Sequence, residues 1–319
     1  DGQIFARSLP KGFQKIKIYS DEIPSLETLA FNWQTRHLLP QETSLKELLR
    51  KRLETYQLSP THLTHFIDLK YGGPESFQLS VLLKFPGSPS PDSSFGNTVH
   101  DALEWMQNEL NRTGQLPDTA SVIDRAKNYL SHEPLAPEQT TQQQRRLEAA
   151  LTIYLESRSE SFRQNNVAEK SFRREGVLLD GEVLMGGKID LLEIDKTNKT
   201  IVVVDYKTGE SHDSWKPETD KLHKYMLQLY CYKLLVENST SYRGYTVTSG
   251  RLEFVEPDAD GAVHALLLEF SPEQLAFTRQ LLHALWKRVK SLDMPDISGY
   301  SDSLAAMKQF EKDLVSEEG

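Results

Sequence analysis

The spacing of apolar residues changes at about Val167. Before this point, residues 97–165 repeat apolar positions with a helical period, and Pro117 and the stretch "HEPLAPEQ" divide them into three helices. After it, apolar and polar residues alternate at every second position, which is typical of β-strands. The pattern therefore predicts a helical part that is followed by a β-rich core.

Within the β-rich part, the short turn "KTNK" separates two strand patterns, so we expect a hairpin there. A helix is predicted from about Glu218 to Asn238, with Pro217 at its start. A closing helix follows at residues 271–292, with Ser271 as its N-cap. The strands are predicted at "AEKSFRREG", "LMGGKIDLLEID", "TIVVVDYK", "SYRGYTVTS", "GRLEFVEP" and "GAVHALLLEF".

The order of these elements predicts a mixed α/β fold of the α+β type rather than a doubly wound sheet. We expect a mixed, mostly antiparallel sheet that is flanked by helices, with a helical insertion before the core. The predicted parts are an N-terminal extension of unclear role (1–57), a main domain (58–295) and an acidic C-terminal tail (296–319), whose last residues, "EKDLVSEEG", we expect to be solvated. The main domain is divided into a helical part (97–165), a β-rich core (166–270) and a closing helix (271–292).

The composition limits the functions that the chain can have. Its 319 residues are 38% hydrophobic, which allows a sizeable core, and carry a net charge of −9. Such a chain has no global positive field, so contact with DNA needs a local basic groove or a metal. Cys231 is the only cysteine, which excludes a four-cysteine zinc or iron–sulfur site and fits a reducing cytoplasm. The sequence has no apolar run of about 18 residues, so no membrane span is predicted.

A charged pair, Asp205 and Lys207, ends the most apolar strand pattern, "TIVVVDYK". If residues 195 and 200 close the hairpin, Asp190 lies opposite Asp205. Two facing carboxylates repel each other, and more strongly where the dielectric constant is low. The repulsion is relieved if one acid is protonated, if a base lies between them, or if a cation binds.

Asp205 and Lys207 are two residues apart in a strand, so their side chains point to one face. Two acids and an amine suit Mg²⁺ or Mn²⁺ together with a phosphate, because hard oxygen ligands bind these ions. A structural salt bridge is the alternative. A second Asp-X-Lys triplet begins at Asp68, but it lacks both the apolar strand and the facing acid, and we interpret it as a chance occurrence.

Several motifs resemble the PD-(D/E)XK nuclease superfamily, and specifically the RecB-type nuclease domain of helicase–nucleases. "MGGKIDLLEID", "TIVVVDYKTG" and "LQLYCYK" occur in the order typical of that branch. "FGNTVHDALE" is similar to its Gly-X-X-X-His helix, and "LSPTHLTHFIDLKYGGPESF" to the segment that precedes the nuclease fold. The resemblance covers roughly residues 58–270 and implies a restriction-endonuclease-like core.

The resemblance implies a nuclease that depends on Mg²⁺ or Mn²⁺. It implies that the metal ligands are the side chains of His100, Asp190 and Asp205 and the backbone carbonyl of Tyr206.

It also implies that Lys207 positions the attacking water and that Glu169 is the acid on the first core strand. Gln228 and Tyr232 match the helix motif that fixes the site and the DNA strand. Structural roles stay open for each of them: Glu169 lies in a charged strand edge, and the two helix residues could form an ordinary exposed face.

The implied partner is DNA, as a single strand or as duplex ends, in exonuclease action that serves repair or recombination. A helicase motor would lie on a missing segment or on a separate chain, because no phosphate-binding loop is present. Many relatives hold a [4Fe–4S] cluster, but Asp68 and Leu69 replace the first cysteine motif here, so no iron–sulfur cluster is expected. The alternative function is an inactive nuclease-like domain that binds DNA ends or docks a helicase.

Overall fold

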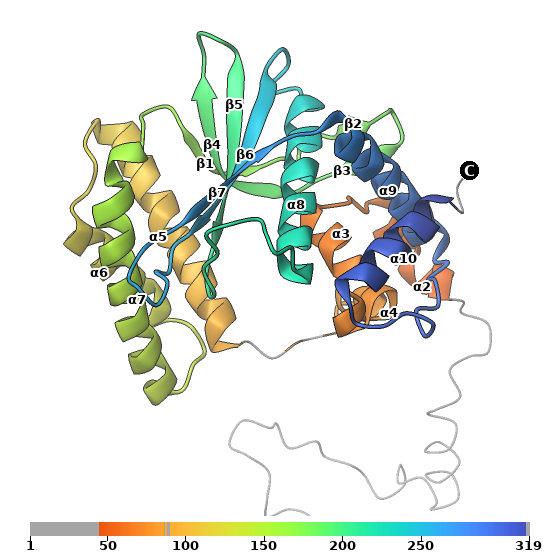
Figure 1. Cartoon of the computed structure of the whole chain (residues 1–319), viewed down its shortest axis with the longest axis horizontal. Coiled ribbons are helices and arrows are strands. Elements are labelled where there is room, and N and C mark those ends of the chain that lie inside the picture. Colours follow the sequence, from red (N-terminus) through yellow and green to blue (C-terminus); the bar gives the residue numbers. More distant parts are fainter. Residues whose placement is uncertain (1–44, 86, 88–89, 317–319) are drawn as a thin grey trace, which may run out of the picture. The chain divides into compact units, whose positions relative to one another are not determined.

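The computed structural model describes residues 45–316, except 86, 88 and 89. In this part of the chain the central sheet has five strands in the order β1-β4-β5-β6-β7, and all neighbours are antiparallel except β5 and β6 (Figure 1). The predicted mixed, mostly antiparallel sheet is therefore confirmed. The strands are β1 (Val167–Ser171), β4 (Lys188–Asp195), β5 (Thr200–Lys207), β6 (Thr246–Phe254) and β7 (Ala265–Glu269), and a separate hairpin joins β2 (Val177–Leu179) to β3 (Val183–Met185).

The predicted helical part consists of three helices that pack on one face of the sheet (Figure 1). They are α5 (Pro91–Thr113), α6 (Thr119–Leu130) and α7 (Pro137–Arg158). Ser90 and Asp118 cap the first two by accepting backbone N–H groups, and Gly114 ends α5 in the left-handed conformation. Leu191 and Val204 of the sheet belong to the same apolar cluster as these helices.

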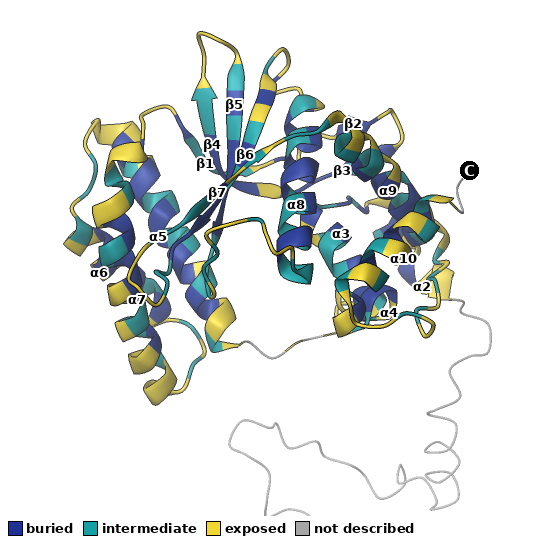
Figure 2. Cartoon of the chain, in the orientation of Figure 1, coloured by how far each residue is buried: buried dark blue, intermediate teal, exposed yellow. Residues whose placement is uncertain are grey.

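Because side chains alternate along a strand, Leu192 and Val203 point to the other face, where helix α8 (Asp220–Glu237) packs. Helix α8 has no exposed residue, whereas α9 (Pro272–Ser291) and α10 (Leu304–Ser316) each have buried and exposed positions (Figure 2). Ser271 caps α9 as predicted, by accepting the backbone N–H of Gln274. The other helices of the described residues are α2 (Leu45–Glu54), α3 (Pro60–Phe66), α4 (Gly73–Phe77), α8 (Asp220–Glu237), α9 (Pro272–Ser291) and α10 (Leu304–Ser316). Three short helical segments are η2 (Leu69–Tyr71), η3 (Gln78–Leu82) and η4 (Ser159–Ser161).

The hairpin register agrees with the prediction from "KTNK". Asp195 pairs with Thr200, and Leu191 pairs with Val204. One step beyond the last of these pairs, Asp190 and Asp205 fall opposite each other.

Two strand predictions were wrong in detail. The stretches "SYRGYTVTS" and "GRLEFVEP" form the single strand β6, because Gly250 lies within the sheet and pairs with both neighbours instead of starting a new strand. Conversely, "LMGGKIDLLEID" contains two strands, because Gly186 and Gly187 separate β3 from β4.

The prediction of a solvated C-terminal tail was also wrong. Residues 304–316 form helix α10, which buries Met307, Phe310 and Leu314 against the core. These three residues recur at helical spacing and form an apolar stripe along one helix face. The acidic residues between and after them led to the prediction of a solvated segment. Glu311, also buried, pairs with His223 of α8 over 2.8 Å. Residues 1–44, most of the predicted extension, lie outside the described part, so the division at residue 57 stays a prediction.

No helix within the described ranges is long and apolar enough to cross a membrane.

Candidate active site

Three acidic residues lie in a row across neighbouring strands. The pairs Ala168–Leu191 and Lys170–Ile189 place Glu169 opposite Asp190, and Asp190 in turn lies opposite Asp205. Glu169 has a φ of 50°, in the left-handed region, so it interrupts regular pairing between β1 and β4. The side chains of these acids are almost fully buried, which makes their mutual repulsion strong.

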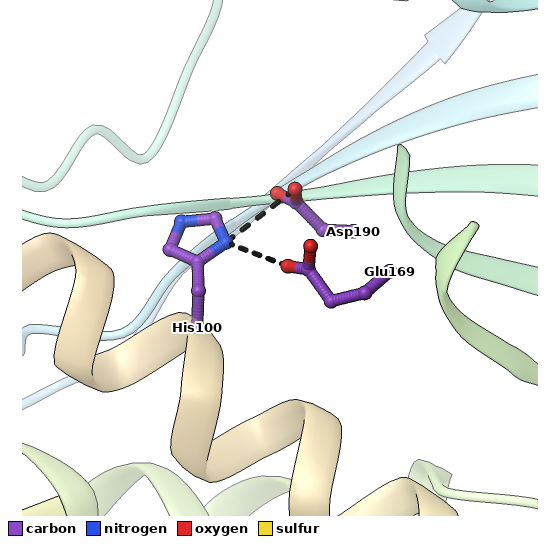
Figure 3. A group of neighbouring side chains, drawn as sticks. All are labelled: His100, Glu169 and Asp190. Atoms are coloured by element: carbon purple, nitrogen blue, oxygen red, sulfur yellow. Dashed lines mark ion pairs between the residues drawn. The ribbon is translucent and has the colours of Figure 1, made fainter. Parts of the chain in front are cut away.

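His100 reaches the first two acids from helix α5 (Figure 3). Its Nδ1 lies 3.4 Å from Oε1 of Glu169 and 3.4 Å from Oδ1 of Asp190. Burial alone lowers the pKa of His100, but the carboxylates of Asp190 and Glu169 raise this pKa to about 10. Without a metal, the imidazole is therefore protonated at neutral pH and neutralises part of the acidic row.

Asp190 is held from the backbone as well as by His100. The N–H of Tyr206 donates to Oδ2 of Asp190 over 2.8 Å, at the point where β4 and β5 stop pairing. Burial raises the pKa of Asp190, but the neighbouring His100 and this N–H group outweigh burial and lower it below its usual value.

Asp205 is tied to a different set of partners. Its Oδ2 lies 2.6 Å from Nζ of Lys207, and its Oδ1 accepts hydrogen bonds from Nε2 of Gln228 and from the hydroxyl of Tyr232, both over 2.9 Å. Burial raises the pKa of Asp205 above its usual value, against the effect of Lys207, and the charge of Asp190 adds to the increase. Of the predicted forms of relief, the structure shows the basic side chain, Lys207 beside Asp205 and His100 beside Asp190.

Lys207 is fixed on three sides. Besides Asp205, Oε1 of Gln228 accepts its hydrogen bond over 2.9 Å, and the ring of Tyr225 lies 4.1 Å from its Nζ. Burial lowers the pKa of Lys207, but Asp205 raises it above its usual value. The ammonium group is therefore charged, and 14% of the side chain is exposed.

These residues, except Tyr225, line one cavity of about 550 Å³. The cavity also exposes residues that we did not predict: Asn97, Asp101 and Glu104 of α5 and Tyr129 of α6. Asn97, Asp101 and Glu104 recur at helical spacing around His100, so the sequence contained a signal that they share its face.

The cavity thus combines an imidazole, carboxylates and a fixed lysine at the end of two core strands. The family model that matches residues 57–301 describes the PD-(D/E)XK nuclease superfamily. The chain belongs to this superfamily. No curated protein sequence matches the chain.

PD-(D/E)XK nucleases use divalent metals, and the donor atoms in this chain fit such an ion. Ligand atoms of His100, Glu169 and Asp190 all lie within 4.8 Å of one another. Carboxylate oxygens suit Mg²⁺ and Mn²⁺, and an imidazole is compatible with Mn²⁺. The geometry groups Glu169 with His100 and Asp190, whereas Asp205 lies next to Lys207, Gln228 and Tyr232.

Tyr206 has its side chain on the opposite face of β5 from Asp205. The buried ring lies edge-on to His100, with the ring centroids 6.2 Å apart, and also contacts Tyr154. The role of its backbone carbonyl as a metal ligand stays a prediction.

The second Asp-X-Lys triplet of this nuclease chain does not line the cavity. Asp68 forms an ion pair with Lys224 of α8 over 2.6 Å, and both side chains are largely buried. This contact links the segment around η2 to α8, which is a structural role.

Proposed function

We propose that this PD-(D/E)XK nuclease is a metal-dependent deoxyribonuclease of the RecB type, which hydrolyses phosphodiester bonds by in-line attack of water without a covalent intermediate. The observation that carries the proposal is the contact of His100 with two strand acids in the same cavity as the Asp205–Lys207 pair. A salt bridge with only a structural role at Lys207 does not explain why His100, from helix α5, faces two further carboxylates.

The metal, Mg²⁺ or Mn²⁺, would be held by His100, Asp190, Asp205 and the backbone carbonyl of Tyr206, and Glu169 is placed to join them. When bound, the ion supplies positive charge to the phosphate and lowers the pKa of a water molecule. We expect His100 to lose its proton when it becomes a ligand, because only a neutral imidazole nitrogen can bind a metal.

Lys207 would position the attacking water and stabilise the negative charge that develops on the phosphate. Gln228 supports this role, because its Oε1 accepts from Nζ of Lys207 while its Nε2 donates to Asp205. Tyr232 donates to the same oxygen of Asp205 and so helps fix the direction of the carboxylate. Helix α8 thus holds the side chains of Asp205 and Lys207 in position before the substrate binds.

The proposed setting is DNA repair or recombination, with DNA single strands or duplex ends as substrates and a helicase motor on another segment or chain. The motifs "GKID", "DYKTG" and "QLYCY" support the RecB-type assignment. We propose a cytoplasmic location and no iron–sulfur cluster, which the single, buried Cys231 supports.

The deciding experiment incubates end-labelled single-stranded and duplex DNA with the protein in Mg²⁺, Mn²⁺ or EDTA and resolves the products on a sequencing gel. We expect cleavage with either ion and none in EDTA, and the Lys207→Ala variant should be inactive under all three conditions. Salt-dependent DNA binding without cleavage would instead support an inactive, DNA-binding domain. Neither binding nor cleavage would contradict both functions.

A further inference from the structure

A second cavity, of about 500 Å³, adjoins the one that contains the acidic row. Ser59 and Arg173 line both cavities, and the neighbours Gly186 and Gly187 each line one of them. The two spaces are therefore neighbours that share part of their lining, near the start of α3 and the segments that flank β1 and β4.

Two backbone segments approach each other closely where the cavities share this lining. The N–H of Leu58 donates to the carbonyl of Leu184, and the N–H of Gly186 donates to the carbonyl of Leu58, both over 2.9 Å. A Cβ atom at Gly186 would lie 2.3 Å from Oε1 of Gln57, so any larger residue there would displace the Gln57 side chain. The wall that carries Ser59 is thus fixed to the β3–β4 connection.

The two cavities differ in charge. The active-site cavity is lined by five carboxylates, those of Asp101, Glu104, Glu169, Asp190 and Asp205, and, besides His100, by only three cations, Arg173, Lys188 and Lys207. Among the described residues, the lining of the second cavity has no carboxylate but three cations, Arg52, Lys84 and Arg173, together with hydroxyl and amide groups. Although the chain is acidic overall, the second cavity is positively charged and lies beside the cavity with the acidic row.

Two of the cations are available to a ligand. The side chains of Lys84 and Arg173 are exposed, and no ion pair involves either of them within the described ranges. Arg52 donates to the carbonyl of Leu82, so its charge is fixed in place but not neutralised. The charge of Arg173 also acts on His62, another residue of this lining: burial first, and then this guanidinium, lower the pKa of His62 to about 4.

We propose that the second cavity binds the phosphodiester backbone of the nucleic-acid strand that is cut, beyond the scissile phosphate. The inference rests on the proposed nuclease function and adds to it a single-strand path. A strand whose scissile phosphate lies at the acidic row passes Ser59 and Arg173 and places its next phosphates near Arg173, Lys84 and Arg52. A cavity of this size is of the class that holds a drug-sized molecule, so it admits one strand rather than a base-paired duplex.

The test measures binding of oligothymidylates from two to twelve nucleotides by fluorescence anisotropy in EDTA, over a range of salt concentrations. All proteins carry Lys207→Ala, so no cleavage occurs. The test variant adds Arg173→Gln and Lys84→Gln. The control adds Arg174→Gln and Lys51→Gln, two exposed residues that line neither cavity, so both variants lose the same net charge. Thermal melts check that each is folded.

We expect the test variant to lose affinity for long strands and to bind the dinucleotide like its parent. The plot of the logarithm of the binding constant against the logarithm of the salt concentration should become less steep. Its slope should decrease in magnitude by about 0.7 for each phosphate that no longer contacts a cation, or about 1.4 in total. The control should keep both the affinity and the slope.

The outcomes separate the two proposals. If the wild-type protein neither binds nor cleaves DNA, the proposed function fails, and this inference fails with it. If it cleaves DNA but test and control variants lose affinity equally, the second cavity is off the strand path while the nuclease function stands. An equal loss of affinity for a blunt duplex and for a single strand would overturn the single-strand path.

Discussion

Gln228 holds Lys207 at the active site: its Oε1 accepts a hydrogen bond from the lysine Nζ over 2.9 Å. The same amide donates through Nε2 to Asp205, so one side chain contacts both the acid and the base. Because this contact joins α8 to the end of β5, the helix takes part in the chemistry that we propose without contacting the His100 cluster.

We expect Gln228→Ala to lower the turnover number by roughly 10- to 100-fold, the usual cost of removing a group that orients a ligand. The Mg²⁺ concentration needed for half-maximal activity should change less than the turnover number, because Tyr232 still donates to Asp205 and Gln228 does not contact the other side-chain ligands. Tyr232→Phe, which removes one donor to Asp205 but keeps the ring, should have a smaller effect in the same direction. Unchanged turnover numbers in both variants would show that this helix face has no catalytic role.

The sequence predicted those features that depend on neighbouring residues. The four-residue turn after Asp195 determined the hairpin register, and the register brought Asp190 and Asp205 together. The caps at Ser271 and the helix breaks around Pro117 depend on local backbone groups in the same way.

Local patterns in the sequence did not predict contacts between distant segments, and the grouping of His100 with Asp190 was expected only from the family resemblance. The grouping of Glu169 with His100 requires a left-handed residue within β1 and a helix from another part of the chain. Likewise, Arg52, Lys84 and Arg173 meet at the second cavity although they are far apart in the sequence and follow no common periodicity. Such contacts arise from tertiary packing, and periodicity describes only which face of an element is apolar.

Metal binding should release a proton from His100. In the metal-free protein the pKa of His100 is raised to about 10, so at pH 7 the imidazole is protonated, whereas a ligand nitrogen must be neutral. Titration calorimetry with Mn²⁺ in two buffers of different ionisation enthalpy should therefore show release of about one proton for each ion.

His100→Gln should release almost no proton and bind Mn²⁺ at least about tenfold more weakly. His132→Gln, a change at an exposed histidine on the loop after α6, is the matched control and should behave like wild type. Proton release that is unaffected by His100→Gln would exclude this histidine as a ligand.

The stability of the fold should fall in mild acid because of His62. Burial and the charge of Arg173 lower the pKa of His62 to about 4 in the folded protein, against 6.5 for an ordinary histidine. Between these two values the unfolded chain binds more protons, so the free energy of unfolding decreases as the pH falls from 6.5 to about 4.

The measurement compares urea denaturation of wild type and His62→Gln at pH 7.5, 6.0 and 4.5, in EDTA. The variant lacks the titrating ring, so the stability difference between the two proteins should narrow or change sign as the pH falls. A difference that is constant over this range would mean that His62 keeps an ordinary pKa.

Asp205→Asn should abolish cleavage, yet leave the metal-free protein as stable as wild type or more stable. Burial and the facing Asp190 raise the pKa of Asp205, so the folded state disfavours its charged form at neutral pH. Asparagine removes this charge and keeps the oxygen that accepts from Tyr232 and Gln228. The loss of the ion pair with Lys207 acts in the opposite direction, but Lys207 retains its hydrogen bond to Gln228.

Thermal melts in EDTA and in Mg²⁺ distinguish a metal ligand from a structural ion-pair partner. Added Mg²⁺ should raise the melting temperature of wild type, because an ion that binds the folded state stabilises it, and should raise that of Asp205→Asn much less. Lys207→Ala is the control, since it should also stop cleavage but keep the stabilisation by Mg²⁺. If Asp205→Asn melts several degrees below wild type in EDTA and gains as much from Mg²⁺, then Asp205 serves to hold Lys207 and does not bind the metal.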